Sequence, residues 1–254
     1  MAEGQRADLL VGNNVLAHVP RLNDFVRGLS MLLAPEGVLT LEFPHLGRLL
    51  ANSQFDTIYH EHFSYFSMST AARVLEAHGL VVFDVEVLTT HGGSLRVFAR
   101  HDARHRLLIS ERVAALRSAE RAEGLLEIAA YTRFAERVRE VKRSLLQFLI
   151  GRKREGKQIA AYGAPAKGNT LLNYCGVRTD FIDYAVDRSP LKQGKLLPGT
   201  RIPIEAPERI RETRPDYVLV LPWNIQAEIA QQLAYVKEWG GRLVVPIPEV
   251  AVLP

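Results

Sequence analysis

Short apolar runs alternate with helix-like segments in the C-terminal part of the chain, and this alternation restricts the fold more than any other feature. An apolar run at residues 159–162 is followed by a glycine-containing loop at 163–168 and then by the start of a helix. Further strand-like runs stand at residues 182–186, 217–221 and 243–246. Strands that are joined through helices lie parallel in a sheet with helices on its faces. This part is therefore predicted to be a doubly wound α/β unit with a mostly parallel sheet.

The N-terminal part shows a different order: strand, helix, strand, loop, helix and a pair of strands. The apolar patterns place these elements at residues 9–11, 22–33, 38–42, 70–78, 80–88 and 94–100. Pro35, Glu36 and Gly37 are predicted to form a turn before the second strand, and Ser69 to cap the second helix. Residues 104–156 contain no proline and predict one or two long amphipathic helices between the two parts.

The segment Tyr59-His60-Glu61-His62-Phe63-Ser64-Tyr65-Phe66 combines two imidazoles, a carboxylate and two phenols. Such a mixture serves proton transfer, metal binding or the recognition of a polar ligand. His60 and His62 would share a face of an extended segment, which leaves a metal site open as an alternative, but no third ligand stands at a diagnostic spacing. A purely structural polar cluster is the other alternative.

The loop at residues 163–168 has features of a phosphate site. Its glycines allow a ligand to approach the backbone, the following helix offers free N–H groups, and Lys167 adds a positive charge. The loop matches neither the Walker A pattern nor the dinucleotide pattern G-x-G-x-x-G, which disfavours an NAD-dependent enzyme. A tight strand-to-helix turn without a ligand explains the loop equally well.

Composition excludes several other classes of protein. The 254 residues carry a net charge of +4 without a basic patch that is interleaved with aromatic residues, so no nucleic acid partner is expected. Cys175 is the only cysteine, which excludes a disulfide framework and a cysteine zinc site. No apolar run has the length of a membrane span, and the first residues lack the apolar core of a signal peptide. A cytoplasmic protein without a membrane partner is expected.

Taken together, these motifs resemble the sugar C-methyltransferases, which use S-adenosylmethionine to methylate a carbon of a nucleotide-linked keto-sugar. The motif Tyr-x-Glu-His of that family matches Tyr59, Glu61 and His62, and an upstream Asn-x-x-x-His pair matches Asn14 and His18. The resemblance implies that His62 is the general base, that Tyr59 is its partner, and that Glu61 orients an imidazole or holds a sugar hydroxyl. It also implies that Asn14 and His18 face the sugar.

The resemblance further implies how the chain is divided into domains. Residues 1–103 would be the C-terminal half of a class I methyltransferase domain, residues 104–156 a helical linker, and residues 157–254 a Rossmann-like C-methyltransferase domain. In the last of these, Gly163, Lys167 and Asn169 would bind the nucleotide-diphosphate keto-sugar.

Asn13 and Val15 would touch the edge of S-adenosylmethionine, because the main cofactor loop of the family would precede Asp8. The chain is thus predicted to be an N-terminally truncated C-methyltransferase, with no metal bound in this chain. The alternative is a catalytically inactive remnant that binds the nucleotide-sugar and lacks the S-adenosylmethionine site. The exposed edge of the strand at residues 9–11 predicts self-association.

Overall fold

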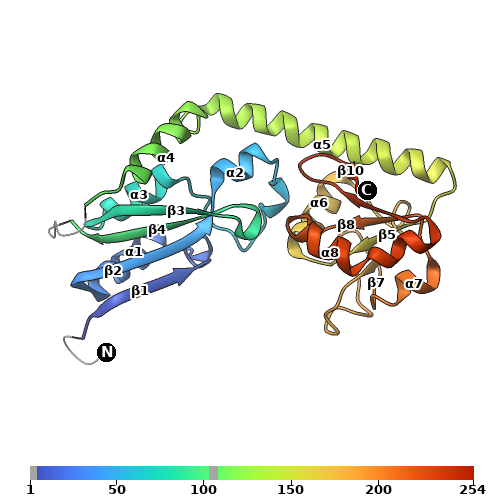
Figure 1. Ribbon diagram of the computed structural model, residues 1–254, viewed down its shortest axis with the longest axis horizontal. Coiled ribbons are helices and arrows are strands. Elements are labelled where there is room, and N and C mark those ends of the chain that lie inside the picture. The colour runs from blue at the N-terminus through green and yellow to red at the C-terminus, as the bar shows by residue number, and fades with distance from the viewer. Residues whose placement is uncertain (1–4, 103–107) are drawn as a thin grey trace. The chain divides into compact units, whose positions relative to one another are not determined.

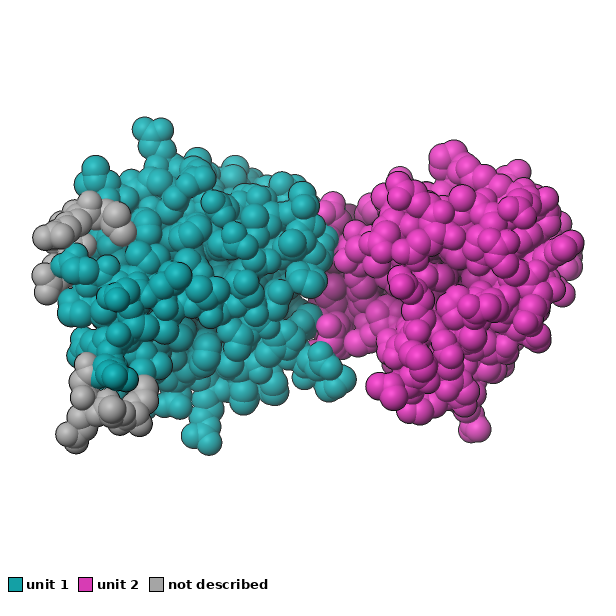
Figure 2. All heavy atoms as spheres, turned by 60° about the horizontal axis from the view of Figure 1, so that its bottom comes forward, with its two compact units in different colours: residues 1–51, 60–133 teal, residues 52–59, 134–254 magenta. Residues whose placement is uncertain are grey.

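The computed structural model describes residues 5–102 and 108–254, and these residues form two compact units (Figure 2). Unit 1 comprises residues 1–51 and 60–133, and unit 2 comprises residues 52–59 and 134–254. The predicted domain boundary between residues 103 and 104 lies outside the described residues. Each unit is α/β, as predicted, and each has its own sheet and core.

Within the described residues, unit 1 is built on a four-stranded sheet in the order β1-β2-β4-β3 (Figure 1). The strand β1 (Ala7–Asn13) is parallel to β2 (Leu33–Pro44), while β4 (Ser94–His101) is antiparallel both to β2 and to β3 (Leu80–Leu88). The carboxyl ends of β1, β2 and β3 and the start of β4 therefore lie at one edge of the sheet. The helical elements of this unit are η1 (Leu16–His18), α1 (Leu22–Leu32), α2 (Leu46–Ala51), α3 (Met68–Glu76), η3 (Thr90–Gly92) and α4 (Glu111–Ala122).

The core of unit 1 follows from the period of its strands. Leu39, Leu41 and Phe43 alternate along β2 and are completely buried, as expected for the inward face of a strand. Leu75 of α3 joins the same apolar cluster. This core holds the carboxyl edge of the sheet in place.

Two local predictions in unit 1 are wrong. Ser67, and not Ser69, caps α3, because Ser67 has the extended backbone of a cap residue and its hydroxyl oxygen accepts the N–H of Thr70 at 3.1 Å. The predicted turn at residues 35–37 lies inside β2, where the pairing with β1 shifts between Leu33 and Val38. The extra residues are accommodated as an irregularity in the strand.

Unit 2 confirms the predicted doubly wound sheet. Its described residues form six strands in the order β10-β9-β8-β5-β6-β7 (Figure 1). All neighbouring pairs in this sheet are parallel except the pair of β9 and β10. The strands are β5 (Ile159–Tyr162), β6 (Ala185–Val186), β7 (Ile204–Glu205), β8 (Tyr217–Val220), β9 (Arg242–Val245) and β10 (Ala251–Val252). The strand predicted at residues 182–186 is thus shorter than expected.

The helical elements of unit 2 cover this sheet and bound its loops. They are η2 (Phe55–Thr57), α5 (Ile128–Arg154), α6 (Ala166–Cys175), α7 (Arg209–Thr213), η4 (Trp223–Ile225), α8 (Gln226–Gln232) and η5 (Ala234–Trp239), with the first residues of α5 belonging to unit 1. Val138, Val141 and Leu145 of α5 are buried in the apolar core of unit 2. Among the helices in the described part of the chain, none is both long and apolar enough to cross a membrane.

The order of the strands places a topological switch point between β5 and β8. The chain runs from β5 outward to β6 and β7 and then returns to the other side of β5 to form β8 and β9. Loops that leave two neighbouring strands in opposite directions create a crevice at their carboxyl ends, where open α/β sheets bind ligands. The loops after β5 and β8 are therefore the candidate ligand loops of unit 2.

Candidate functional site

Asn14 lies at the carboxyl edge of the sheet in unit 1, directly after β1. It has a left-handed backbone with a φ of 53°, a conformation that Asn tolerates better than most residues. Its backbone N–H donates to the carbonyl oxygen of Glu42 at 2.8 Å. Its side-chain nitrogen Nδ2 lies 3.1 Å from Nε2 of His91, while its buried oxygen Oδ1 has no hydrogen-bond partner in the described part of the chain. That oxygen is an acceptor that a ligand hydroxyl could satisfy.

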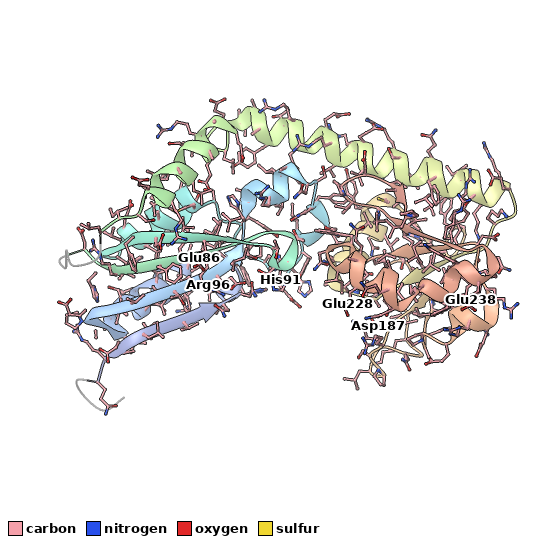
Figure 3. The ribbon with its side chains drawn as sticks, in the orientation of Figure 1. Glu86, His91, Arg96, Asp187, Glu228 and Glu238 are labelled. Carbon is pink, nitrogen blue, oxygen red and sulfur yellow. The ribbon has the colours of Figure 1, made fainter. Side chains whose placement is uncertain are left out.

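His91 is a residue of this edge that the sequence interpretation missed. It stands in η3 between β3 and β4, with a φ of 55°. The loop is held by the buried acid Glu42, which accepts the hydroxyl of Thr90 at 3.0 Å and the guanidinium of Arg96 at 2.9 Å. Arg96 also pairs with Glu86 of the neighbouring strand at 3.5 Å (Figure 3). The available signal was the sequence Thr-His-Gly-Gly between two strand-like runs, from which no functional role of His91 was predicted.

The structure brings His18 and His62 together at the same edge. Their ring centroids are 4.8 Å apart, and the ring of His62 also lies edge-on to Tyr65 at 5.9 Å. Nδ1 of His18 is 2.9 Å from the backbone oxygen of Glu61. A carbonyl oxygen can only accept, so Nδ1 carries a proton, and Nε2 of a neutral His18 is the acceptor. The contact with His18 is thus made by the backbone of Glu61, while the side chain of Glu61, to which the prediction gave a role, is exposed.

The motif segment is divided between the two units. Tyr59 belongs to unit 2, whereas Glu61 and His62 belong to unit 1. The residues before Tyr59 are fastened inside unit 2. Phe55 is buried and lies edge-on to Tyr174 of α6, with their ring centroids 5.0 Å apart. Asp56 is fully buried, and its Oδ2 accepts the indole N–H of Trp223 at 2.7 Å.

Asp56 and Lys167 form an electrostatic pair at the switch point of unit 2. Burial raises the pKa of Asp56 to about 6, against the opposing effects of the Trp223 hydrogen bond and the positive charge of Lys167. Burial likewise lowers the pKa of Lys167, and the negative charge of Asp56 opposes that change. The ammonium group of Lys167 donates to the side-chain oxygen of Asn224 and lies 4.5 Å from the centroid of the Trp223 ring. Lys167 follows β5 and Trp223 follows β8, so both residues lie next to the candidate ligand loops of unit 2.

Gly163 lies in the loop after β5, and Asn169 lies in α6 together with Lys167. Gly163 has a φ of 87°, and a Cβ added there would come within 2.6 Å of Cγ of Pro222, so this position requires glycine. The side-chain oxygen of Asn169 is buried without a hydrogen-bond partner among the residues described. Sequence reasoning found these residues but missed Asp56, whose indole partner lies 167 residues away in the chain.

Asn13, the last residue of β1, and Val15, in the loop after it, flank Asn14. Asn13 is exposed and Val15 is half-buried, so both side chains can meet a ligand. Gly12 lets this loop pack closely, because a Cβ added there would come within 2.8 Å of Cδ2 of Leu41. The described residues hold no group of three or more His, Cys, Asp or Glu side chains that could bind a metal ion.

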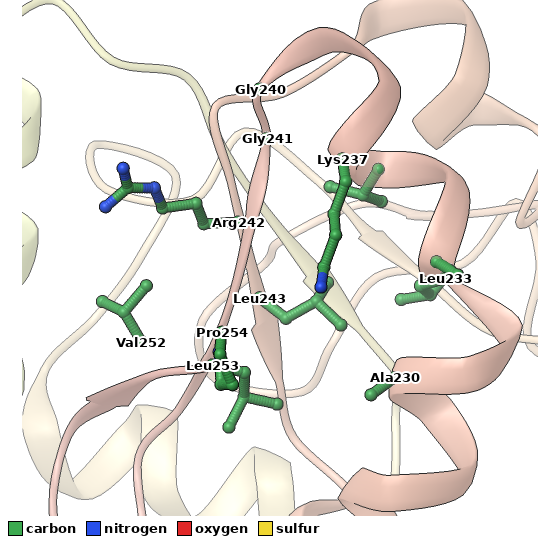
Figure 4. Close-up of a pocket in the computed structure, with 12 residues that line it drawn as sticks. Ala230, Leu233, Lys237, Gly240, Gly241, Arg242, Leu243, Val252, Leu253 and Pro254 are labelled. Atoms are coloured by element: carbon green, nitrogen blue, oxygen red, sulfur yellow. The ribbon is translucent and has the colours of Figure 1, made fainter.

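An apolar groove of unit 2 lies away from these residues. It is formed by η5, β9 and β10 (Figure 4). Its lining includes Gly240, Gly241 and Arg242, which stand at the amino end of β9. Lys167 and Trp223 instead lie in helical segments that follow the carboxyl ends of β5 and β8, so the groove is not part of the candidate site.

The fold and the edge cluster define an α/β protein with paired imidazoles at the carboxyl edge of its first sheet. Two family models match the chain: a C-methyltransferase C-terminal domain at residues 89–248 and a methyltransferase domain at residues 2–85. The first match covers more than half of the chain, which therefore belongs to the family of the C-methyltransferase C-terminal domain. The family membership predicted from the motifs is confirmed.

A C-methyltransferase of Streptomyces niveus, NovU, is 43% identical to this chain over 247 residues. The alignment covers 97% of this chain and 59% of NovU, so the chain spans little more than half the length of that relative. The activity, substrates and partners of NovU are therefore not carried over to this chain as facts.

Solved methyltransferases match a smaller part of the chain. Magnesium protoporphyrin IX methyltransferase from Synechocystis is 16% identical over 40% of this chain and 48% of its own, with a TM-score of 0.32. An O-methyltransferase family protein from Burkholderia thailandensis is 19% identical over 40% of this chain and 32% of its own, with a TM-score of 0.30. Likenesses this low carry no argument about the site.

Proposed function

We propose that the chain carries the acceptor-side part of an S-adenosylmethionine-dependent C-methyltransferase. Its substrate would be a nucleotide-diphosphate keto-deoxysugar, methylated on a carbon next to the ketone. The observation that carries this proposal is the pair of imidazoles, His18 and His62, with ring centroids 4.8 Å apart at a carboxyl edge. At this edge Asn14 has a buried oxygen that no described residue satisfies. Family membership supports the type of reaction.

In unit 1, the reaction needs a base and a group that stabilises an enolate. His62 takes the proton from the carbon next to the ketone, and the electron pair of that C–H bond moves into the enolate. His18, held through its Nδ1 proton, offers its other ring nitrogen to the sugar. Oδ1 of Asn14 accepts a hydrogen bond from a sugar hydroxyl.

S-adenosylmethionine supplies an activated methyl group when it is bound. Asn13 and Val15 are the residues of this chain that would hold its edge, and their partial exposure fits that role. In unit 2, Lys167 would contact the diphosphate, and Gly163 and Asn169 would shape and satisfy the ligand loop. The role of Tyr59 as the partner of His62 stays a prediction from the family motif.

The proposal is tested by the exchange of the α-proton of a nucleotide-linked keto-deoxysugar in deuterated water, followed by proton NMR. Exchange requires only the base and the sugar site, so it can be measured without methyl transfer. His62→Gln is expected to slow exchange by roughly two to four orders of magnitude, because a positioned base contributes about that much. His60→Gln is the matched control, because His60 is an exposed imidazole in the same segment.

Two results would contradict the proposal in different ways. Unchanged exchange in His62→Gln would remove His62 as the base. Binding of the sugar without any exchange would favour the alternative, in which the chain only binds the nucleotide-sugar.

Self-association through β1 belongs to the same proposal. β1 is an edge strand, and its residues Leu9 and Val11 are 59% and 62% exposed. An edge with apolar side chains can pair with a strand of another chain. Sedimentation of the purified chain would test this, and Val11→Lys should shift it towards the monomer.

A further inference from the structure

Asp56 is a buried acid that the proposed proton transfer does not use. Its side chain is completely inaccessible to solvent, and Oδ2 accepts the indole N–H of Trp223 at 2.7 Å. Oδ1 has no hydrogen-bond partner among the residues that the structure describes. A buried carboxylate with one unsatisfied oxygen is costly, so a fold that keeps one there calls for an explanation.

The positive charge near Asp56 comes from Lys167. Lys167 donates to Asn224, which is neutral, and lies against the face of Trp223. The ion pairs formed between described residues do not include Lys167. The groups that act on the Asp56 carboxyl are the charged Lys167 of α6, the neutral indole of Trp223 in η4 and the backbone N–H groups of Asp56 and Thr57. The charge of Lys167 is therefore balanced mainly by Asp56.

An arriving diphosphate would change this balance. Its oxygens would bind the ammonium group of Lys167, so that less of the positive charge of Lys167 would compensate the negative charge of Asp56. It would also add negative charge near a carboxylate that is already buried. Both effects disfavour the ionised form of Asp56. The neutral acid would in turn have an O–H group on Oδ1, the oxygen that has no partner among the described residues.

We propose that binding of a diphosphate at Lys167 is coupled to the uptake of one proton by Asp56. The proton comes from solvent and resides on Oδ1, while Oδ2 keeps its hydrogen bond from Trp223. This inference rests on the proposed function, which assigns the nucleotide-sugar diphosphate to Lys167. It adds a role for Asp56: the acid sets how tightly the diphosphate binds at a given pH.

The test is isothermal titration of the whole chain with UDP-glucose, whose diphosphate does not titrate near neutral pH. Titrations in buffers of different ionisation enthalpy give the number of protons taken up. Roughly half to one proton is expected per bound UDP-glucose at pH 7. The affinity should fall by up to about 10-fold for each unit of pH above 7, because the protonated acid favours binding.

Asp56→Asn is the decisive variant, because an amide oxygen can still accept the Trp223 hydrogen bond. It should abolish this proton uptake, flatten the pH dependence, and bind about 10-fold more tightly than the natural chain at pH 8. Asp180→Asn, which removes an exposed acid from the same unit, should leave proton uptake unchanged. Unchanged tryptophan fluorescence and circular dichroism would show that each variant is folded.

The outcomes separate this inference from the proposed function. Binding of UDP-glucose without proton uptake, or equal uptake in Asp56→Asn, would overturn the role of Asp56 and leave the nucleotide-sugar site standing. Failure of the natural chain to bind UDP-glucose between pH 5 and 8 would overturn both the role of Asp56 and the nucleotide-sugar site. This pH range spans the pKa of Asp56, which is about 6.

Discussion

Glu120 in α4 gives the sharpest test of how unit 1 is held together. Its side chain is 1% exposed, and its two oxygens accept three hydrogen bonds. The donors are the backbone N–H groups of Met68 at 2.6 Å and Ser69 at 2.9 Å, and Nε2 of His45 at 3.0 Å. The first turn of α3 has backbone N–H groups without partners inside the helix, and a carboxylate from another helix satisfies two of them.

Glu120→Gln replaces one acceptor oxygen with an NH₂ group of nearly the same size. At least one of the three donors then faces another donor, so a buried hydrogen bond is lost. Hydrogen bonds to charged groups contribute about 1.5–3 kcal/mol each, and a buried donor left without an acceptor costs about 1–3 kcal/mol. We expect the free energy of unfolding of unit 1 to fall by about 3 kcal/mol at pH 7.

The loss should depend on pH in a defined direction. Burial alone would raise the pKa of Glu120, but the hydrogen bonds from His45, Ser69 and Met68 together hold it below its usual 4.5. A depressed pKa stabilises the folded state above the unfolded value and ceases to do so as the pH falls through the folded value. The difference between the natural chain and Glu120→Gln should therefore be full at pH 7 and shrink below pH 4.5.

Urea denaturation followed by circular dichroism measures the stability, and hydrogen exchange of the peptide that contains α3 assigns the change to unit 1. Glu127→Gln is the control, because it removes an exposed acid from the same unit. If Glu120→Gln were within about 1 kcal/mol of this control, the hydrogen bonds would not have the net value argued here.

Two further predictions concern unit 2. Gly163→Ala should destabilise the unit by about 3 kcal/mol or more, because it adds a clash with Pro222 to an unfavourable left-handed backbone; Gly156→Ala, with a similar positive φ and open space in the described structure, should cost only about 1 kcal/mol. Thermal unfolding of the two variants compares these costs directly. Trp223→Phe removes the hydrogen-bond donor to Asp56 and should lower the free energy of unfolding by about 2 kcal/mol at pH 8. The loss should be smaller at pH 5, because the lost hydrogen bond favours the ionised form of Asp56, whose pKa is about 6. Equal losses at the two pH values in urea denaturation would refute this reasoning.

Much of the fold could be predicted because it depends on short-range patterns. The apolar runs at residues 159–162 and 217–221 predicted the strands β5 and β8, and their alternation with helices predicted a doubly wound sheet. The errors were also local. Ser67 rather than Ser69 caps α3, because the helix begins at buried Met68, two residues before the predicted start at residue 70.

The candidate site divides in the same way. The chemistry of Asn14, His18 and His62 was visible in the sequence as a family motif, and the structure brings the two imidazoles to one edge. The contact of Asn14 with His91 joins residues 77 positions apart, and no periodic pattern links them. A phosphate-binding role of Lys167 stays a prediction from its glycine loop, whereas the electrostatic relation of Lys167 to Asp56 was not predicted.

The sequence by itself therefore determined the succession of strands and helices along the chain and the choice of candidate acid–base residues, because both are inferred from neighbouring positions. Only the tertiary structure decided which of those residues meet and what environment they experience. Asp56 shows the physical reason: its pKa depends on burial, on an indole N–H 167 residues away and on the charge of Lys167, and these come together only when the sheet and its loops have formed.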